Sequence, residues 1–197
     1  NRLLSQAISF YGEPNIKNFG VENKLKKQSK INTKEYKSVT EEKELSKIVN
    51  DLNGKSIFAV DTETTSLNPQ DAELVGISLS YAANASFYIP IGHRNTRSLS
   101  KEYVINKLKP ILEDPSIQKV GQNIKYDYII FKRNGIELTS IEDTMLLSYT
   151  LDAGNNRHNM DTLSELHLGH KTISYKELVG SGKKQLNFKF KEKKIKN

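Results

Sequence analysis

Two carboxylates stand close together near the end of an apolar segment, at Asp61 and Glu63. The run Ile57–Val60 before them is rich in β-branched and aromatic residues, and it predicts a strand buried on both faces. Side chains alternate along a strand, so the two acids point to the same face. Adjacent carboxylates repel each other unless a cation lies between them, and such oxygen ligands suit Mg²⁺ or Mn²⁺. The pattern is compatible with a divalent-metal site, although a solvent-exposed acidic strand end is the simpler interpretation of a lone Asp-x-Glu.

A second segment, from Val120 to Asp127, changes that balance; it reads Val-Gly-Gln-Asn-Ile-Lys-Tyr-Asp. Together the two segments resemble the first and second exonuclease motifs in the proofreading domain of bacterial DNA polymerase I. The resemblance covers roughly residues 56–188 and continues, in the same order, through Asp143–Leu146, Arg157–Asp161 and His170–Ile173. It implies a 3′–5′ exonuclease domain, which hydrolyses 3′-terminal nucleotides from single-stranded or frayed DNA.

The resemblance also implies roles for individual residues. In the family, the positions of Asp61, Glu63 and Asp127 carry the catalytic carboxylates that hold two divalent metal ions, Mg²⁺ or Mn²⁺, around the scissile phosphate. Two such ions generate a hydroxide near neutral pH and stabilise both the attacking and the leaving oxygen. The positions that the family places along the single strand correspond to Leu67, Gln122, Asn123, Tyr126 and Phe188. Among these, Leu67 matches a wedge against the terminal base and Phe188 an aromatic that stacks on a base.

Each of these residues also has a structural interpretation. Asp127 alone could be an exposed acid in the first turn of a helix, where the helix dipole favours negative charge. Leu67 and Phe188 could be ordinary core residues. The presence of Asp61 and Glu63 at the spacing of the family favours the metal-binding interpretation for Asp127.

The third motif of the family, Tyr-x-x-x-Asp, is expected soon after Phe188, but the sequence has no Tyr after Tyr175 and no Asp after Asp161. Glu192 is the only acid in the lysine-rich end. We therefore expect a domain truncated before the third motif, without its C-terminal helices, with one metal position weakened and activity impaired. The alternative is a non-catalytic single-stranded nucleic-acid-binding remnant of a split or decayed polymerase gene. A separately encoded polymerase fragment is a candidate partner in either case.

Composition limits the class of protein. The 197 residues include no cysteine, which excludes disulfides and thiolate metal sites. No apolar stretch approaches the length of a membrane span and no signal peptide opens the chain, so we expect no membrane partner and a cytoplasmic location. The formal net charge of +7 invites a nucleic-acid interpretation, but Lys183–Asn197 alone carries seven lysines against one acid. A solvated basic tail explains most of that charge.

Hydrophobic periodicity predicts the remaining elements. Helices are expected from about Thr40, after Ser100, from Ile124 to about Asn134, and over 141–151, 160–168 and 174–179. Strands are expected at 57–64, 74–81, 87–91 and 117–120, the first three forming a meander. This order matches an α/β, ribonuclease H-like 3′–5′ exonuclease fold, with a central mixed sheet flanked by helices. We divide the chain into a linker over 1–35, the exonuclease-like domain over 36–188 and a basic tail over 189–197.

Overall fold

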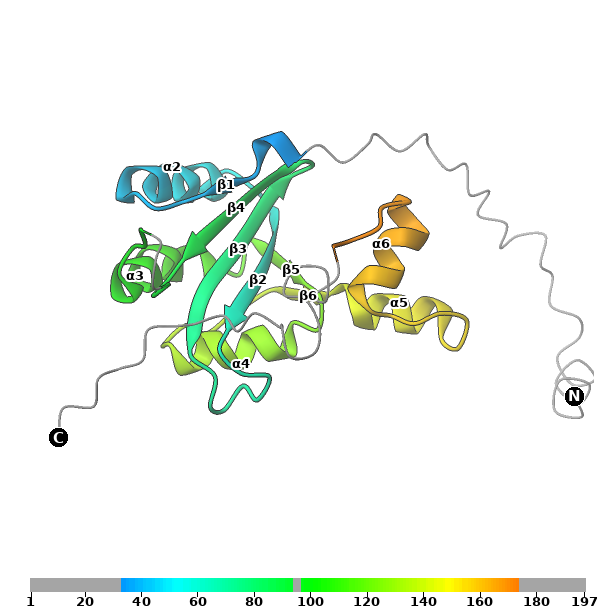
Figure 1. The fold of residues 1–197 in the computed structure, drawn as a ribbon. Helices are drawn as coiled ribbons and strands as arrows, with labels where there is room; N and C mark the ends of the chain where they lie inside the picture. Colours follow the sequence, from blue (N-terminus) through cyan, green and yellow to red (C-terminus); the bar gives the residue numbers. More distant parts are fainter. Residues whose placement is uncertain (1–32, 94–96, 174–197) are drawn as a thin grey trace, which may run out of the picture. The chain divides into compact units, whose positions relative to one another are not determined.

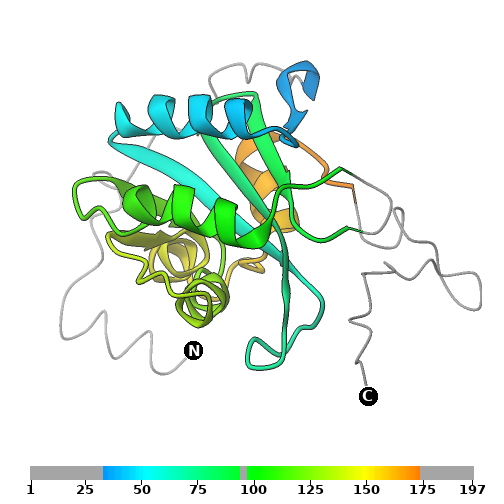
Figure 2. The ribbon, with the colours of Figure 1, turned by 90° about the vertical axis from the view of Figure 1, so that its left-hand side faces the viewer.

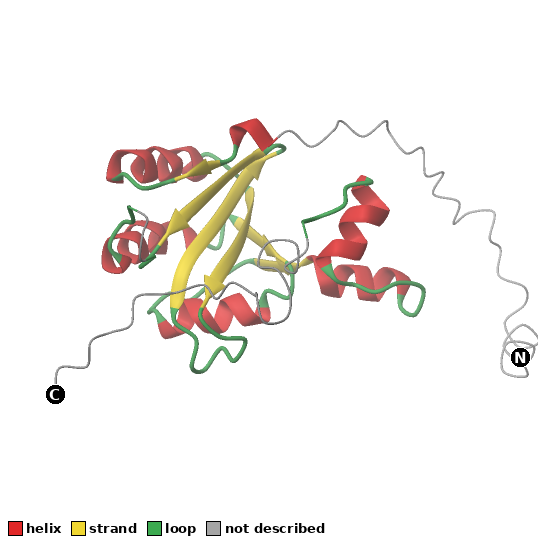
Figure 3. Cartoon of the chain, viewed as in Figure 1, coloured by secondary structure: helices red, strands yellow, loops and turns green. Residues whose placement is uncertain are grey.

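The computed structural model describes residues 33–93 and 97–173, which form a six-stranded sheet with helices packed against it (Figure 1, Figure 3). The strands are β1 Lys37–Ser38, β2 Ile57–Thr64, β3 Leu74–Ala82, β4 Ala85–Pro90, β5 Gln118–Gly121 and β6 Ile141–Asp143. The helices are the 3₁₀ turn η2 Thr33–Glu35, then α2 Glu42–Asn53, α3 Lys101–Leu112, α4 Lys125–Arg133, α5 Thr144–Asp152 and α6 Met160–Leu168. In these two ranges, no helix combines the length and the apolar character needed to cross a membrane.

The sheet is mixed, with the strand order β1-β4-β3-β2-β5-β6. β2, β3 and β4 form the predicted antiparallel meander, and β5 runs parallel to β2 on its other side. The predicted ribonuclease H-like fold is therefore confirmed. The two short edge strands were not predicted, and residues 141–143, expected as the start of a helix, pair with β5 as β6. Asp143 then begins helix α5 by accepting a hydrogen bond from the backbone of Met145.

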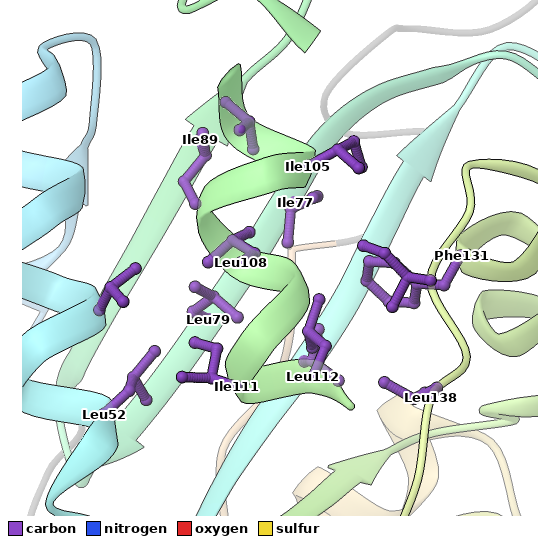
Figure 4. Packing of buried hydrophobic residues seen from close by; sticks show 14 of the residues in the cluster. Leu52, Ile77, Leu79, Ile89, Ile105, Leu108, Ile111, Leu112, Phe131 and Leu138 are labelled. Atoms are coloured by element: carbon purple, nitrogen blue, oxygen red, sulfur yellow. The ribbon is translucent and has the colours of Figure 1, made fainter. Parts of the chain in front are cut away.

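The core lies between the sheet and helices α2 and α3, which run side by side over the same face (Figure 2). α3 turns Leu108 and Ile111 toward Leu79 of the sheet, and Phe131 of α4 closes the core at its side (Figure 4). Ser100 caps α3 as predicted, because its hydroxyl accepts from the backbone N–H of Tyr103 at 3.2 Å. These contacts fix the sheet whose central strand carries the acidic residues.

The opposite face of the sheet is open at β2 within the described part of the chain. Phe58, Val60 and Thr62 are buried, whereas Ile57, Ala59 and both acids are exposed. The prediction of a strand buried on both faces was therefore wrong. An apolar run does not reveal how many faces of a strand are covered, and here helices cover only one of the two faces of β2 in the described residues. The same alternation confirms that Asp61 and Glu63 share a face.

Several expectations fall outside the described residues. These are the linker up to residue 32, the helix expected at 174–179, Phe188, the absence of C-terminal helices and the basic tail.

Candidate active site

The two acids of the first motif lie on the open face of β2, directly opposite small residues of β3. Asp61 pairs with Ser78 and Glu63 pairs with Gly76 in the antiparallel ladder. Paired residues in a ladder point to the same face, so the small side chain of Ser78 leaves room beside Asp61. The sheet therefore holds the two acids rigidly and keeps them accessible.

Asp127 reaches the same strand from helix α4. The turn that follows β5 places Asp127 in the first turn of α4, where its side chain is 3% exposed. Its Oδ1 accepts two hydrogen bonds from Thr62, one from the backbone N–H at 2.8 Å and one from the hydroxyl at 2.5 Å. Thr62 stands between Asp61 and Glu63, so two segments 65 residues apart in the sequence meet at one point. The interpretation of Asp127 as an exposed helix-start acid is excluded by this burial.

All three carboxylates bind protons more tightly than isolated carboxylates do. The surrounding protein partly removes water from Asp61 although the residue still reaches solvent, and this desolvation raises its pKa. Desolvation, and then the negative charge of Asp61, raises the pKa of Glu63. Burial raises the pKa of Asp127 to about 6; the charge of Asp61 adds to this rise, while the hydrogen bonds from Thr62 oppose it. A group of carboxylates with raised pKa values is stabilised by any cation that binds beside it. This electrostatic situation is the one expected of a site for a divalent cation.

The donor set agrees in its chemistry with Mg²⁺ or Mn²⁺. Carboxylate oxygens are their preferred ligands, and the described residues offer Asp61 next to Glu63 and next to Asp127. Over residues 33–93 and 97–173, no three acidic, histidine or cysteine side chains converge closely enough to enclose an ion by themselves. Mg²⁺ is commonly held by one or two carboxylates together with substrate phosphate and water, so these pairs fit the ion without a closed cage.

The turn before α4 carries Gln122 and Asn123, which were predicted to lie along the path of the single-stranded DNA. Asn123 is exposed, with a positive φ of 59°, and its backbone N–H donates to the buried Asp143 at 3.0 Å. The side chain of Gln122 is held between Thr144, whose hydroxyl donates to it, and the carbonyl of His158, to which it donates at 2.7 Å. The turn is thus fixed in shape, with the side chain of Asn123 open to solvent.

Leu67 lies in the loop after β2 and is 97% exposed, which excludes a core role. Helix α4 holds this loop at several points. The hydroxyl of Tyr126 donates to the carbonyl of Ser66, and Arg133 donates to the carbonyls of Pro69 and Ala72 at 2.7 and 2.6 Å. An apolar side chain is therefore presented to solvent on a well-supported loop, next to the strand that bears the acids. Tyr126 was predicted to lie near the path of the single-stranded DNA. Among the described residues its hydroxyl donates a hydrogen bond to this loop, and to none of the carboxylates.

A pocket of about 220 Å³ opens beside Asp61. It lies on the open face of the sheet and is bordered by β2, β3, β5 and the start of α6. Its lining is formed by Ala59, Val60, Asp61, Ser78, Leu79, Ser80, Ser86, Val120, Gly121, Gln122, Thr144 and Met160.

Three residues at the site were not predicted from the sequence. Thr62 lies between the two acids and Arg133 at the end of helix α4, and neither was among the expected site residues. Tyr88 of β4 was read as a strand residue, yet the charge of Glu63 contributes to its raised pKa. A threonine between two motif acids and an arginine at a helix end carry no distinctive sequence signal, because their partners lie about 60 residues away.

The mixed sheet, with its three carboxylates beside the central strand, defines the class as a ribonuclease H-like nuclease fold. The EXO domain of Nibbler from Aedes aegypti aligns over 76% of this chain and 76% of its own, with a TM-score of 0.61 and 15% identity. NrnC of Brucella melitensis with bound Mg²⁺ aligns over 71% of this chain and 62% of its own, with a TM-score of 0.52 and 20% identity. At these identities the likeness concerns the fold alone.

Sequence comparison then gives the family. The family model of the 3′–5′ exonuclease domain of A-type DNA polymerases matches residues 36–192. DNA polymerase I of Rhizobium leguminosarum is 43% identical over 164 residues, which cover 73% of this chain and 16% of that polymerase. The chain belongs to the 3′–5′ exonuclease domain family of DNA polymerase I, a family of nucleases, and it spans about 16% of the length of this curated relative.

Proposed function

We propose that the chain binds the 3′ end of single-stranded or frayed DNA and hydrolyses its terminal nucleotides, with Mg²⁺ or Mn²⁺ bound at Asp61, Glu63 and Asp127. The observation that carries this proposal is the junction at Thr62, where a buried carboxylate of α4 meets the strand that bears the other two. Membership of the exonuclease family supports the reaction type, and the raised pKa values of the carboxylates support a cation.

When bound, the metal supplies a water of lowered pKa and neutralises charge on the attacking and leaving oxygens. The protein holds its three carboxylates on rigid elements. In this proposal Leu67 contacts the terminal base and Asn123 donates to the sugar–phosphate backbone. The exposure of both side chains, 97% for Leu67, supports these roles. The turnover of the chain then depends on how well its residues position the scissile phosphate and exclude water.

We further propose that hydrolysis by these 197 residues is slow. The third motif contributes a tyrosine that orients water and a fourth carboxylate, and residues 176–197 contain neither a tyrosine nor an aspartate. Loss of one well-placed group that stabilises a transition state costs on the order of 10²–10³ in rate. The effects of losing two groups that act as a unit need not multiply. We therefore expect the combined loss in rate to be of this size or larger.

The test is primer shortening by the purified 197-residue chain with Mn²⁺, on a 5′-labelled duplex with a frayed 3′ end. We expect removal of single nucleotides at a rate far below that of an intact proofreading domain run alongside. Asp61→Ala should abolish the remaining activity, because Asp61 neighbours both other carboxylates. Shortening that is indifferent to Asp61→Ala contradicts the proposal and indicates a contaminating nuclease. Robust shortening that depends on Asp61 contradicts the expected impairment and indicates that another group supplies the missing carboxylate.

A second candidate function is non-catalytic binding of single strands, favoured by residues 176–197, which contain neither the tyrosine nor the aspartate of the third motif. Fluorescence anisotropy with a labelled oligonucleotide in EDTA distinguishes the two. Binding that persists without metal, combined with no shortening in Mn²⁺, selects the binding module. A separately encoded polymerase fragment is the candidate protein partner, and supplying such a fragment should restore hydrolysis if it carries the third motif.

A further inference from the structure

Two rows of paired residues cross the open face of the sheet, and one of them leads from a site carboxylate to a tyrosine. Asp61 of β2 pairs with Ser78 of β3, which pairs with Tyr88 of β4. In the next row, Glu63 pairs with Gly76. Because paired residues point to the same face, the Tyr88 side chain emerges on the face that bears both acids.

Gly76 lets Tyr88 lean toward Glu63. A Cβ placed on Gly76 would stand 2.2 Å from the Tyr88 hydroxyl oxygen and 2.5 Å from two ring carbons, far below any real contact. The phenol therefore lies directly over the backbone of Gly76, in the space that a side chain would otherwise fill. Since Gly76 is the ladder partner of Glu63, the hydroxyl comes to rest beside that acid. The close approach of the Tyr88 ring therefore explains why this position holds a glycine.

A histidine fixes the other side of the phenol. The Tyr88 hydroxyl and Nε2 of His93 lie 2.7 Å apart, and the two rings meet edge to face at 70° with their centroids 5.9 Å apart. His93 follows Gly92, whose positive φ of 79° turns the chain back after β4. The phenol is protonated at neutral pH, as an ordinary tyrosine is; burial, and then the charge of Glu63, raises its pKa further, to about 12. His93 and Gly76 therefore hold a neutral hydroxyl close to Glu63, with no charge repulsion between the two groups.

We propose that Tyr88, held by His93 and seated on Gly76, is a positioning residue for Glu63 during metal binding. The inference rests on the proposed metal site. The phenol, seated over Gly76, limits the positions open to the Glu63 side chain and brings a hydroxyl close to it. Groups of this kind, which orient a metal-binding side chain without touching the ion, typically change metal affinity by about 10- to 100-fold when they are removed.

The experiment is a Mn²⁺ titration of the full chain by calorimetry, which needs no catalytic turnover. Tyr88→Phe keeps the ring over Gly76 and removes the hydroxyl; we expect it to weaken Mn²⁺ binding roughly tenfold. Gly76→Ala, which displaces the ring, should weaken binding at least as much. Tyr81→Phe is the matched control, because the Tyr81 hydroxyl contacts Asp51, and its affinity should equal that of the wild type. Urea unfolding of each variant establishes that the fold is retained.

A double-mutant comparison separates a positioning role from a general structural one. If Tyr88 acts through Glu63, then Tyr88→Phe should have no further effect on the Mn²⁺ binding that remains in Glu63→Gln. Equal weakening in both backgrounds overturns the inference, and so does unchanged affinity of Tyr88→Phe in the wild-type background. Absence of Mn²⁺ binding by the wild-type chain instead overturns the metal site itself, and the inference with it.

Discussion

Thr62 donates two hydrogen bonds to the same oxygen of Asp127, from its backbone N–H at 2.8 Å and from its hydroxyl at 2.5 Å. The contact joins the central strand to the first turn of α4 at the point where the strand carries its two acids. Hydrogen bonds to a carboxylate favour its charged form, whereas burial disfavours it. Burial has the larger effect here, and the pKa of Asp127 rises to about 6.

Asp127→Asn is expected to stabilise the metal-free protein in a pH-dependent way. The native pKa of about 6 exceeds the ordinary value of 3.8, so the native state binds this proton more tightly than the unfolded state. The contribution of Asp127 to stability is therefore fully present below about pH 4 and is lost as the pH rises through 6. That loss is on the order of 2–3 kcal/mol at pH 7.5. Asparagine stays neutral and can still accept both hydrogen bonds from Thr62.

Urea unfolding in EDTA between pH 4 and pH 8 measures this effect. The difference between Asp127→Asn and the wild type should be near zero at pH 4 and should grow to its full size by about pH 7.5. Addition of Mn²⁺ should reverse the order, because an ion that binds the native state stabilises the protein that binds it better. A difference that does not vary with pH would count against a raised pKa at Asp127.

Thr62→Val tests the hydroxyl alone. The substitution keeps the shape of the side chain and the backbone hydrogen bond, but it removes a hydrogen bond to a charged group, which costs about 1.5–3 kcal/mol. Because that hydrogen bond lowers the pKa of Asp127, its loss should raise the pKa further. NMR titration of the carboxyl carbons follows the shift directly. Thr150→Val, on an exposed position of α5, is the control and should leave the pKa of Asp127 unchanged.

Local patterns in the sequence were sufficient for the elements that carry the acids. The apolar run before Asp61 predicted β2 with its bounds, and period-two alternation predicted that Glu63 lies on the same face. Helix α4 was expected to end at about Asn134, and the next residue, Gly135, has the positive φ of 80° that commonly follows the end of a helix. Each of these features depends on neighbouring residues in the chain, which is why a single sequence reveals it.

Features that depend on distant partners were not predicted. The position of the helices decides which face of β2 is open. The sequence does not reveal it, because the exposed Ile57 is as apolar as the buried residues beside it. β6 consists of three residues, too few for a recognisable pattern, and it exists because β5 offers it a free edge. The support of the Leu67 loop by Arg133 joins segments more than 60 residues apart. Such contacts follow from the tertiary structure alone.

Lys119→Met is expected to destabilise the strand that leads into the second motif. Lys119 is fully buried, and its Nζ donates to the carbonyls of Asp114 and Ile117, both at 2.7 Å. Methionine fills the same space but leaves both carbonyls without this donor, and each unsatisfied buried group costs about 1–3 kcal/mol. We expect a loss of about 2–4 kcal/mol by urea unfolding. Lys101→Met, at an exposed position of α3, should change stability by less than about 0.5 kcal/mol. Equal effects of the two substitutions would show that the buried hydrogen bonds contribute nothing.

The last prediction separates the proposed contact of Leu67 with DNA from the support that Arg133 gives to its loop. Leu67 is 97% exposed, so Leu67→Ala should leave stability unchanged within about 0.5 kcal/mol. If Leu67 packs against a terminal base, partial burial of its side chain is worth about 1 kcal/mol, or roughly fivefold in the Kd for a single strand. Arg133→Ala removes the two hydrogen bonds that fix the loop at Pro69 and Ala72. It should therefore weaken binding by a similar factor and also expose the loop to proteolysis.

The measurements are fluorescence anisotropy with a 3′-labelled oligonucleotide and limited proteolysis with mapping of the first cleavage site. Lys132→Ala is the matched control on α4, because Lys132 faces solvent and contacts Tyr128 and Glu137 away from the loop. It should alter neither the Kd nor the cleavage pattern. Weakened binding by Leu67→Ala without new cleavage, together with weakened binding and new cleavage by Arg133→Ala, is the expected pair of results. If Leu67→Ala binds as tightly as the wild type while Arg133→Ala does not, the loop backbone and not the leucine contacts the DNA.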